Sequence, residues 1–421
     1  MWPHQMQRRY SGSTKENDLL QHLKKRITMA GPLTVADYMK EVLTNPLSGY
    51  YMHRDVFGSA GDFITSPEIS QMFGEMLGVW IVNEWLNCYN GQKIQIVELG
   101  PGRGTLADDM LRVFSQFPEF ASKISLHLVE VSPALSHIQA IKLTGDTDSD
   151  EESTSQTAKE SNITESEDGG PYRQEKSKYG PLVSWYKSLA EVPEQLSCYI
   201  GHEFLDALPI HKFHKTEKGW REVMIDIDPE KEGLRFVLAP SDTPASKAFL
   251  QVSPSEERSN LEVCPSAAII VQEVTKRILQ KGGYSLFADY GHSGEKGGTF
   301  RAFKKHKLHD PLEDPGTADL TADVDFSYLR KFTSDTVSVF GPITQEKFLT
   351  NMGIGYRLQA LLQSASQDQW ADLISGYKML TSPEQMGERF KFFSITRKHN
   401  NDYAPAGFSD LHVKDDNSEG S

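Results

Sequence analysis

The central part of the chain alternates two hydrophobic patterns. Short and mostly apolar runs, typical of buried strands, occur at 94–97, 125–130, 198–204 and 283–290. Longer segments repeat apolar residues at helical spacing, at 67–81 and at 267–280. The first of them follows Ser66, the predicted N-cap, and begins with Pro67. Strands that alternate with helices predict a parallel, doubly wound sheet, so we expect an α/β fold.

A pattern of hairpins interrupts this alternation. Three short segments predict successive hairpin strands at 210–213, 220–227 and 234–238. We assign them to an inserted β-hairpin lobe at 207–265, a substrate lobe beside the main sheet. Residues 390–397 predict a last strand, and a polar tail follows at 399–421.

Composition marks the other regions. Residues 144–178 are rich in Asp, Glu, Ser and Thr and nearly free of apolar side chains, which predicts a disordered acidic insert. Residues 1–15 contain Arg and Lys but no acid, which indicates a mitochondrial targeting remnant; an ordinary basic terminus is the alternative. The remaining predicted regions are an N-terminal helical region closing on a cofactor at 16–92, a core at 93–398 and a substrate-cleft loop region at 291–335.

Charge and cysteine content narrow the class of protein. A hydrophobic fraction of 38% in 421 residues is sufficient for a real core, and a net charge of −14 argues against nucleic acid as a bulk partner. The three cysteines show no paired spacing, so we expect neither disulfides nor zinc and assign a reducing compartment. No apolar run approaches the roughly 20 residues of a membrane span.

The sharpest functional motif is the glycine loop that follows the first apolar run. Gly100, Gly102 and Gly104 alternate after Glu98, and glycines let a backbone turn sharply and approach a ligand. Dinucleotide sites favour a different glycine spacing, and a strand-end acid would repel a pyrophosphate but attract a sulfonium or ammonium. The loop therefore predicts binding of S-adenosylmethionine.

A second strand end supports a nucleoside site. Glu130 ends the strand at 125–130, where its carboxylate can accept hydrogen bonds from ribose hydroxyls, and Ser132 begins the next helix. Upstream, Gly61, Asp62 and Thr65 form a polar entry that we expect to close over the cofactor. The alternative is that both acids are solvated strand ends and the glycines an ordinary turn.

Candidate catalytic acids follow the run at 198–204. Methyl transfer to an arginine requires a localised lone pair on a guanidinium that stays protonated in water. Glu203 and Asp206 could bind a guanidinium in bidentate fashion and accept its proton. Alternatively, Asp206 caps a turn and Glu203 pairs with a structural base.

Two further segments carry polar candidates. Asp289 or Tyr290 could contact a substrate at the end of the run at 283–290, although a structural turn explains that segment equally well. The run 306–326 predicts a polar loop lining the acceptor cleft, from which we take His309 as a third catalytic candidate. Its histidines and aspartates lack an established metal-ligand spacing, so no metal is assigned.

Four motifs in order resemble the MidA-like methyltransferases, whose eukaryotic members are mitochondrial assembly factors for respiratory complex I. They lie at 61–69, 97–105, 203–209 and 309–326. The resemblance covers about 28–397 without the acidic insert. At His202 the chain departs from bacterial relatives, which commonly have Asn there, so no role is transferred to that position.

The resemblance implies a class I (Rossmann-like) fold with a mostly parallel, seven-stranded sheet. It also implies a mitochondrial matrix location and symmetric dimethylation of an arginine in a core subunit of complex I. Carried over by motif, the three glycines and Glu98 would hold the donor, Glu130 its ribose, and Glu203 with Asp206 would lie near the acceptor.

Two other functions stay open from sequence. A non-catalytic assembly chaperone could retain the donor pocket, and a small-molecule methyltransferase could use the same motifs. A homodimer is compatible with the chain but has no linear signature.

Overall fold

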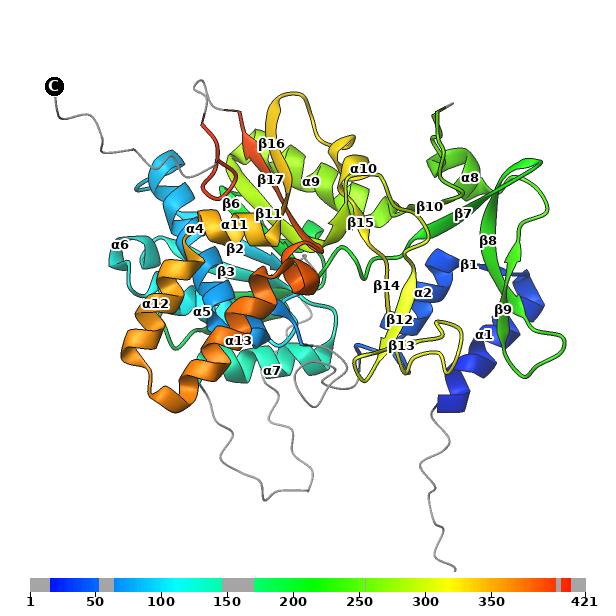
Figure 1. The fold of residues 1–421 in the computed structure, drawn as a ribbon, viewed down its shortest axis with the longest axis horizontal. Helices are drawn as coiled ribbons and strands as arrows, with labels where there is room; N and C mark the ends of the chain where they lie inside the picture. The colour runs from blue at the N-terminus through cyan, green and yellow to red at the C-terminus, as the bar shows by residue number, and fades with distance from the viewer. Residues whose placement is uncertain (1–15, 53–63, 146–169, 254, 399–402, 410–421) are drawn as a thin grey trace, which may run out of the picture. The chain divides into compact units, whose positions relative to one another are not determined.

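The computed structural model describes residues 16–52, 64–145, 170–253, 255–398 and 403–409 (Figure 1). The chain divides into two compact units. The larger unit comprises 55–208, 264–296 and 322–421, and the smaller comprises 1–54, 209–263 and 297–321. The predicted targeting remnant, most of the acidic insert and most of the polar tail lie outside the described residues, as do Gly61 and Asp62.

A mixed sheet of nine strands forms the centre of the larger unit. Its strands lie in the order β16, β17, β11, β6, β2, β3, β5 and β4, and β15 pairs with β11. Their bounds are β2 (Ile94–Leu99), β3 (Ile124–Val129), β4 (Arg173–Lys176), β5 (Leu182–Tyr186), β6 (Ser197–His202), β11 (Gly283–His292), β15 (Val324–Asp325), β16 (Val337–Thr344) and β17 (Phe390–Arg397).

The sheet confirms the predicted α/β class but not the predicted strand number. The strands from β5 to β11 run parallel, whereas β4, β17 and β16 are antiparallel to their neighbours. The described residues contain nine strands in this sheet, two more than the predicted seven. The polar sequence of β4 and the two residues of β15 carry no apolar run. The carboxyl ends of the parallel strands meet at one edge, where ligands bind in such sheets.

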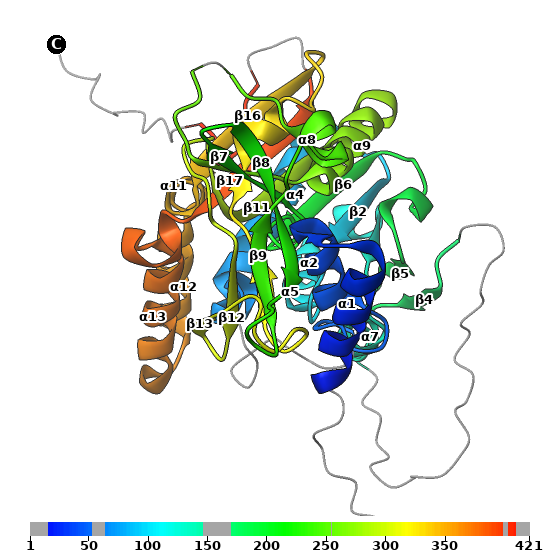
Figure 2. The same ribbon diagram turned by 90° about the vertical axis from the view of Figure 1, so that its right-hand side faces the viewer.

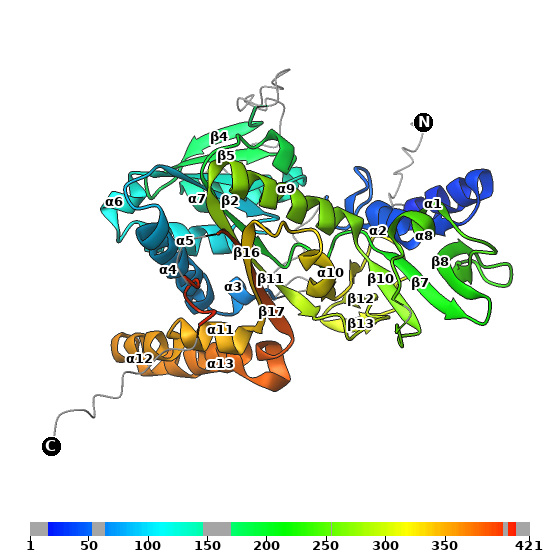
Figure 3. The ribbon, with the colours of Figure 1, turned by 90° about the horizontal axis from the view of Figure 1, so that it is seen from above.

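Helices cover both faces of this sheet. Apolar side chains of α4, α5 and α7 belong to one core cluster, and those of α9 and α10 belong to another. Figure 3 shows these helices beside the strands of the sheet. The helices of the larger unit are α3 (Ser66–Ile69), α4 (Gln71–Cys88), α5 (Thr105–Phe114), α6 (Pro118–Ala121), α7 (Pro133–Thr144), α9 (Pro265–Lys281), α10 (Phe326–Arg330), α11 (Gln345–Asn351), α12 (Ile354–Ser364) and α13 (Trp370–Thr381).

The helix predicted to begin at Ser66 is broken at Ser70. Thr65, not Ser66, is the N-cap residue of α3, and its side chain makes no capping hydrogen bond. Ser70 has an extended backbone, and its side chain accepts the Met72 N–H at the start of α4. A serine that can cap a new helix therefore divides the segment into two helices that apolar spacing alone cannot separate.

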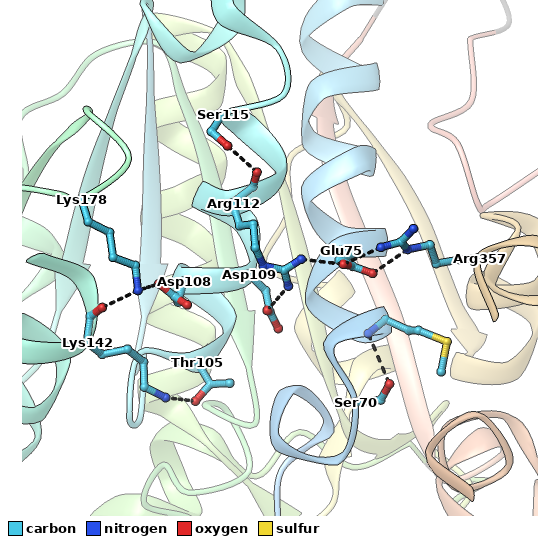
Figure 4. A network of polar contacts seen from close by, with 11 residues as sticks. Ser70, Glu75, Thr105, Asp108, Asp109, Arg112, Ser115, Lys142, Lys178 and Arg357 are labelled. Atoms are coloured by element: carbon cyan, nitrogen blue, oxygen red, sulfur yellow. Dashed lines mark hydrogen bonds and ion pairs between the residues drawn. The ribbon is translucent and has the colours of Figure 1, made fainter. Parts of the chain in front are cut away.

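A buried ionic network joins three helices of the larger unit (Figure 4). Glu75 on α4 accepts a hydrogen bond from Arg112 on α5 at 2.7 Å and two from Arg357 on α12 at 2.8 and 2.9 Å. Burial alone would raise the pKa of Glu75, but these bonds outweigh it and hold the pKa below its ordinary value. A charge buried in this way needs both arginines, so the network fixes α5 and α12 to α4.

The segment 403–409 is attached to the other half of α4. Glu84 accepts hydrogen bonds from the Tyr403 hydroxyl at 2.6 Å and from the Ala406 N–H at 3.0 Å. The indole N–H of Trp80 donates to the Ala406 carbonyl at 2.9 Å. The Glu84 carboxylate and the Trp80 indole, both buried in α4, thus form hydrogen bonds with the segment 403–409.

The smaller unit contains the predicted hairpins (Figure 2). Its five-stranded sheet has the order β1, β8, β7 and β10, with β9 paired to β8, and a second sheet has the order β13, β12 and β14. The strands are β1 (Leu33–Thr34), β7 (His211–Thr216), β8 (Gly219–Ile227), β9 (Leu234–Leu238), β10 (Asn260–Val263), β12 (Arg301–Lys304), β13 (Lys307–His309) and β14 (Asp319–Thr321). The helices are α1 (Glu16–Ala30), α2 (Val35–Thr44) and α8 (Pro244–Phe249).

Candidate active site

The glycine loop between β2 and α5 has the backbone that its sequence predicts. Gly100, Gly102 and Gly104 have φ angles of +64°, +54° and +76°. These values lie in the left-handed region, where a side chain strains the backbone. A Cβ atom on Gly100 would also lie 2.7 Å from the ring of Phe204. The loop therefore needs its glycines, and it passes directly against the segment that follows β6.

Glu98 is the buried acid at the end of β2. Its side chain is 2% exposed, and burial raises its pKa to about 8. Its Oε2 atom is buried and has no hydrogen-bond partner among the described residues. A buried carboxylate without a partner is costly, and a cationic ligand would restore its charge.

Glu130, just after β3, is held by neutral donors. Its Oε1 accepts the Ser132 N–H at 2.7 Å, and its Oε2 accepts the side-chain amide of Gln139 at 3.0 Å. Burial raises the pKa of Glu130 to about 7, although these hydrogen bonds act in the opposite direction. Ser132 is also the N-cap residue of α7, where its hydroxyl accepts the Leu135 N–H.

Gln139 connects the two strand ends. Its side-chain amide donates to Glu130 and, at 2.7 Å, to the carbonyl of Gly102, while its oxygen accepts the indole N–H of Trp185. The glycine loop and the ribose-binding candidate are thus fixed to each other through one amide. Sequence analysis missed Gln139, because a glutamine on an amphipathic helix has no distinguishing spacing.

Glu203 follows β6 in a strained conformation. It is not a glycine, yet its φ angle is +48°, and its N–H donates to the Ala288 carbonyl at 3.0 Å. Its Oε1 accepts the Ser66 N–H at 3.3 Å and lies 3.3 Å from Nε2 of His202. Burial lowers the pKa of the His202 imidazole to about 3, so that this neighbour is neutral. Strain of this kind often marks a functional position.

Asp289 and Asp206 complete a group of three acids. Asp289 is fully buried, and its Oδ2 accepts the N–H groups of Phe204 at 3.2 Å and Leu205 at 2.9 Å. Burial and the neighbouring Asp206 carboxylate hold the pKa of Asp289 well above its ordinary value. We call Glu203, Asp206 and Asp289 the acidic cluster. Asp289, one of two alternatives in its segment, thus lies beside both predicted catalytic acids.

The other predicted site residues lie elsewhere or outside the described structure. Thr65 is half-buried before α3, and Tyr290 packs on Phe390 with ring centroids 4.0 Å apart. His309 belongs to the smaller unit, on β13, where a ring nitrogen lies 3.2 Å from the Glu313 carbonyl oxygen. Gly61 and Asp62 are not described. The roles of all the predicted site residues, those of His309, Gly61 and Asp62 included, stay predictions.

Neither a metal centre nor a membrane span is found in the part of the chain that the structure describes. The described residues contain no group of three or more His, Cys, Asp or Glu side chains placed to hold a metal ion. None of the helices in the described ranges is both long and apolar enough to cross a membrane.

Known proteins identify the family. A profile described as an S-adenosyl-L-methionine-dependent methyltransferase matches residues 76–343. The protein arginine methyltransferase NDUFAF7, mitochondrial, of Homo sapiens is 52% identical over 382 residues, which cover 90% of this chain and 83% of that protein. The chain belongs to the NDUFAF7 family of methyltransferases. The resemblance to MidA-like enzymes is thereby confirmed.

A more distant relative agrees with this family, and a solved structure agrees with its fold. The homolog from Drosophila melanogaster, also named mitochondrial, is 44% identical over 401 residues, 93% of this chain and 88% of that protein. A crystal structure from Burkholderia thailandensis with bound S-adenosylhomocysteine is 24% identical, with a TM-score of 0.74 over 94% of this chain and 93% of that chain. The methyltransferase fold and the mitochondrial location are therefore confirmed.

S-Adenosylmethionine is the methyl donor of this family, as predicted. The residues at the strand ends fit it. Glu98 would supply a buried, unpartnered oxygen for a cationic group, and the left-handed glycines would let the backbone of the loop approach the donor closely. Glu130 would supply the acceptor for ribose hydroxyls.

Proposed function

We propose that this protein transfers methyl groups from S-adenosylmethionine to an arginine of a protein substrate. The observation that carries the proposal is the acidic cluster, which follows two parallel strands beside the donor loop. The ring of Phe204, within the turn after β6, faces Gly100 directly. Relatives that share about half of their residues with this chain are named protein arginine methyltransferases.

The acids would bind and orient the acceptor. A guanidinium offers several N–H donors in one plane, so Glu203 and Asp206 could each receive a charge-assisted hydrogen bond. Their charge favours localising the positive charge away from the attacking nitrogen. The bound donor supplies an electrophilic methyl group on its sulfonium. As the nitrogen forms its new bond, a proton leaves it for the Glu203 carboxylate.

On the donor side, Glu98 and the three glycines would hold the amino acid part, and Glu130 with Ser132 would hold the ribose. Thr65, with Gly61 and Asp62 before it, would close over the donor, and His309 would serve the acceptor. We also infer that β16, β17, β11, β6, β2, β3 and β5 form a seven-stranded methyltransferase core to which β4 and β15 are additions. The order of these seven strands supports that division.

The substrate and the mitochondrial compartment follow from the resemblance. We infer a mitochondrial matrix enzyme that dimethylates one arginine of a core complex I subunit symmetrically, as the resemblance implies. A type II reaction of this kind methylates each terminal nitrogen once. The acceptor must therefore turn or rebind between two transfers, with the same acids facing either nitrogen.

The test is mass spectrometry of complex I subunits after an immature assembly fraction is incubated with the protein and isotopically labelled S-adenosylmethionine. Label on both terminal nitrogens of one arginine, absent with Gly102→Val, supports the proposal. Donor binding without label on any protein would contradict it and indicate an assembly chaperone. Label on free small acceptors alone would indicate a small-molecule methyltransferase.

A further inference from the structure

Asp289 has a structural task in the turn after β6. It lies one residue beyond Ala288, which pairs with His202 in the register of β11 and β6. Its Oδ2 accepts two consecutive N–H groups, those of Phe204 and Leu205. These bonds fix the backbone between Glu203 and Asp206, so Asp289 positions both proposed acceptor-binding acids.

The second oxygen of Asp289 is in an unusual environment. Oδ1 is buried and has no hydrogen-bond donor among the described residues, although the Asp206 carboxyl group lies within hydrogen-bonding reach of Asp289. Ionised carboxylates can only accept hydrogen bonds, so Asp206 and Asp289 repel each other when both are ionised. One proton converts the same contact into a hydrogen bond, as in other buried pairs of carboxyl groups.

The charged groups around Asp289 favour this proton. Glu203 on the same turn adds negative charge, and it also raises the pKa of Asp289. The cation opposite Asp289 in the sheet register is Lys391 on β17. Its Nζ donates to the carbonyl and the carboxylate of Glu388 at 2.7 and 2.9 Å, so its charge is already engaged.

We propose that Asp289 and Asp206 hold one proton between them and release it to solvent when a guanidinium enters the acidic cluster. The identity of this cation rests on the proposed function. The positive charge of the guanidinium replaces that of the proton, and a second carboxylate becomes available to bind it. Asp289 is thus a positioning residue. It holds the backbone of the turn after β6 in one conformation, and it becomes ionised when the guanidinium binds.

Infrared spectroscopy of the whole protein at pH 7 tests whether Asp289 and Asp206 share a proton. We expect a carbonyl stretching band of a protonated carboxyl group, in addition to that of Glu98 with its pKa of about 8, that is shifted in D₂O and lost in Asp289→Asn. The asparagine keeps an oxygen for Phe204 and Leu205 and donates to Asp206. Asp206→Asn should remove the same band, because its amide then donates to an ionised Asp289. Asp109→Asn, a buried acid in α5, is the control that should keep it.

Equal band intensity in the wild type and both cluster variants would overturn the shared proton. Near-ultraviolet circular dichroism and donor binding establish that each variant is folded. If one cluster variant fails to fold, the other decides the result. This measurement uses no acceptor, so it stands or falls independently of arginine methylation.

Titration with methylguanidinium tests whether a bound guanidinium releases this proton. The wild-type band should disappear as the probe is added, with about one proton released per bound cation when binding heats are compared in buffers of different ionisation enthalpy. Tetramethylammonium, a cation without N–H donors, should leave the band in place. A band that survives the highest methylguanidinium concentration would overturn the proposed release, whereas failure of the labelling experiment alone would overturn the proposed acceptor.

Discussion

The donor loop and the acidic cluster end neighbouring strands of one sheet, but their carboxyl groups are arranged differently. Glu130 is surrounded by a backbone N–H and an amide that satisfy both of its oxygens. In the acidic cluster, the carboxyl groups face one another, and burial makes their repulsion worse. The carboxylate of Glu130 is therefore hydrogen-bonded before a ligand binds, whereas we propose that a cation completes the acidic cluster electrostatically.

The largest expected effect is loss of donor binding in Gly102→Val. The left-handed backbone at this position strains a β-branched residue by about 1–3 kcal/mol, and the Gly102 carbonyl holds Gln139. We expect donor affinity, measured by calorimetry, to fall at least about 100-fold.

Gly91→Val is the matched control for this variant. Gly91 has a φ angle of +79°, and a Cβ atom added to it would have no heavy atom within 4 Å, so the same strain arises away from the site. Donor binding should survive there. Equal loss in both variants would mean that backbone strain lowers stability without acting on the loop.

Glu203→Gln should separate transfer from donor binding. The amide is nearly isosteric and can still accept the Ser66 N–H, but it cannot take a proton from the acceptor. A missing general base lowers kcat by roughly 100-fold to 10,000-fold.

The measurement is single-turnover methylation together with donor affinity, which should change less than about twofold. Glu119→Gln on α6 serves as a control at an acid outside the cluster. Undiminished turnover in Glu203→Gln would remove Glu203 from the mechanism.

Gln139→Met should weaken donor binding. Methionine has a similar length but supplies no hydrogen bond to Gly102 or Glu130 and no oxygen for Trp185. We expect donor affinity to fall about tenfold, the equivalent of about one lost hydrogen bond to a charged group. Gln116→Met after α5 should leave the affinity unchanged. If the two variants behave alike, the glycine loop does not depend on Gln139.

The last expected effect concerns the free energy of unfolding, which depends on pH. The pKa of Glu98 is raised to about 8 in the fold, so the folded state binds a proton that the unfolded state releases above its ordinary pKa. This stabilisation is complete below the unfolded pKa and is lost as pH rises through about 8. The slope approaches about −1.4 kcal/mol per pH unit between the two values.

Urea unfolding of the ligand-free protein from pH 5 to pH 8 measures this slope. Glu98→Gln should flatten it, although Glu130, with a pKa of about 7, continues to act in the same direction. An unchanged slope in Glu98→Gln would show that Glu98 stays ionised in the fold.

The sequence predicts the donor side better than the acidic cluster for a physical reason. Gly100, Glu98 and Glu130 lie within or directly after their own strands, so local pattern and turn chemistry are sufficient to predict their positions. Asp289 and Asp206 come together only because β11 lies beside β6, and no local spacing records that contact. His309 likewise belongs to a loop motif, but contacts distant in sequence assign it to the smaller unit.

The errors in secondary structure have a similar origin. Neither β4 nor β15 carries the apolar run that predicts a strand, and pairing with a formed sheet makes each of them regular. The break at Ser70 depends on a capping bond to Met72 that competes with continuous helix spacing. In both cases a hydrogen bond, and not hydrophobic periodicity, decides the structure.

The attachment of Glu84 to the segment 403–409 determines when the protein can finish folding. Glu84 and Ala406 are 322 residues apart, so a chain synthesised or threaded from its N-terminus presents α4 long before the partners of this carboxylate exist. Until they arrive, burying α4 leaves a charge without its hydrogen bonds. Synthesis of residues 403–406 therefore comes before complete burial of α4, and a translation product that ends earlier would leave Glu84 without these hydrogen bonds.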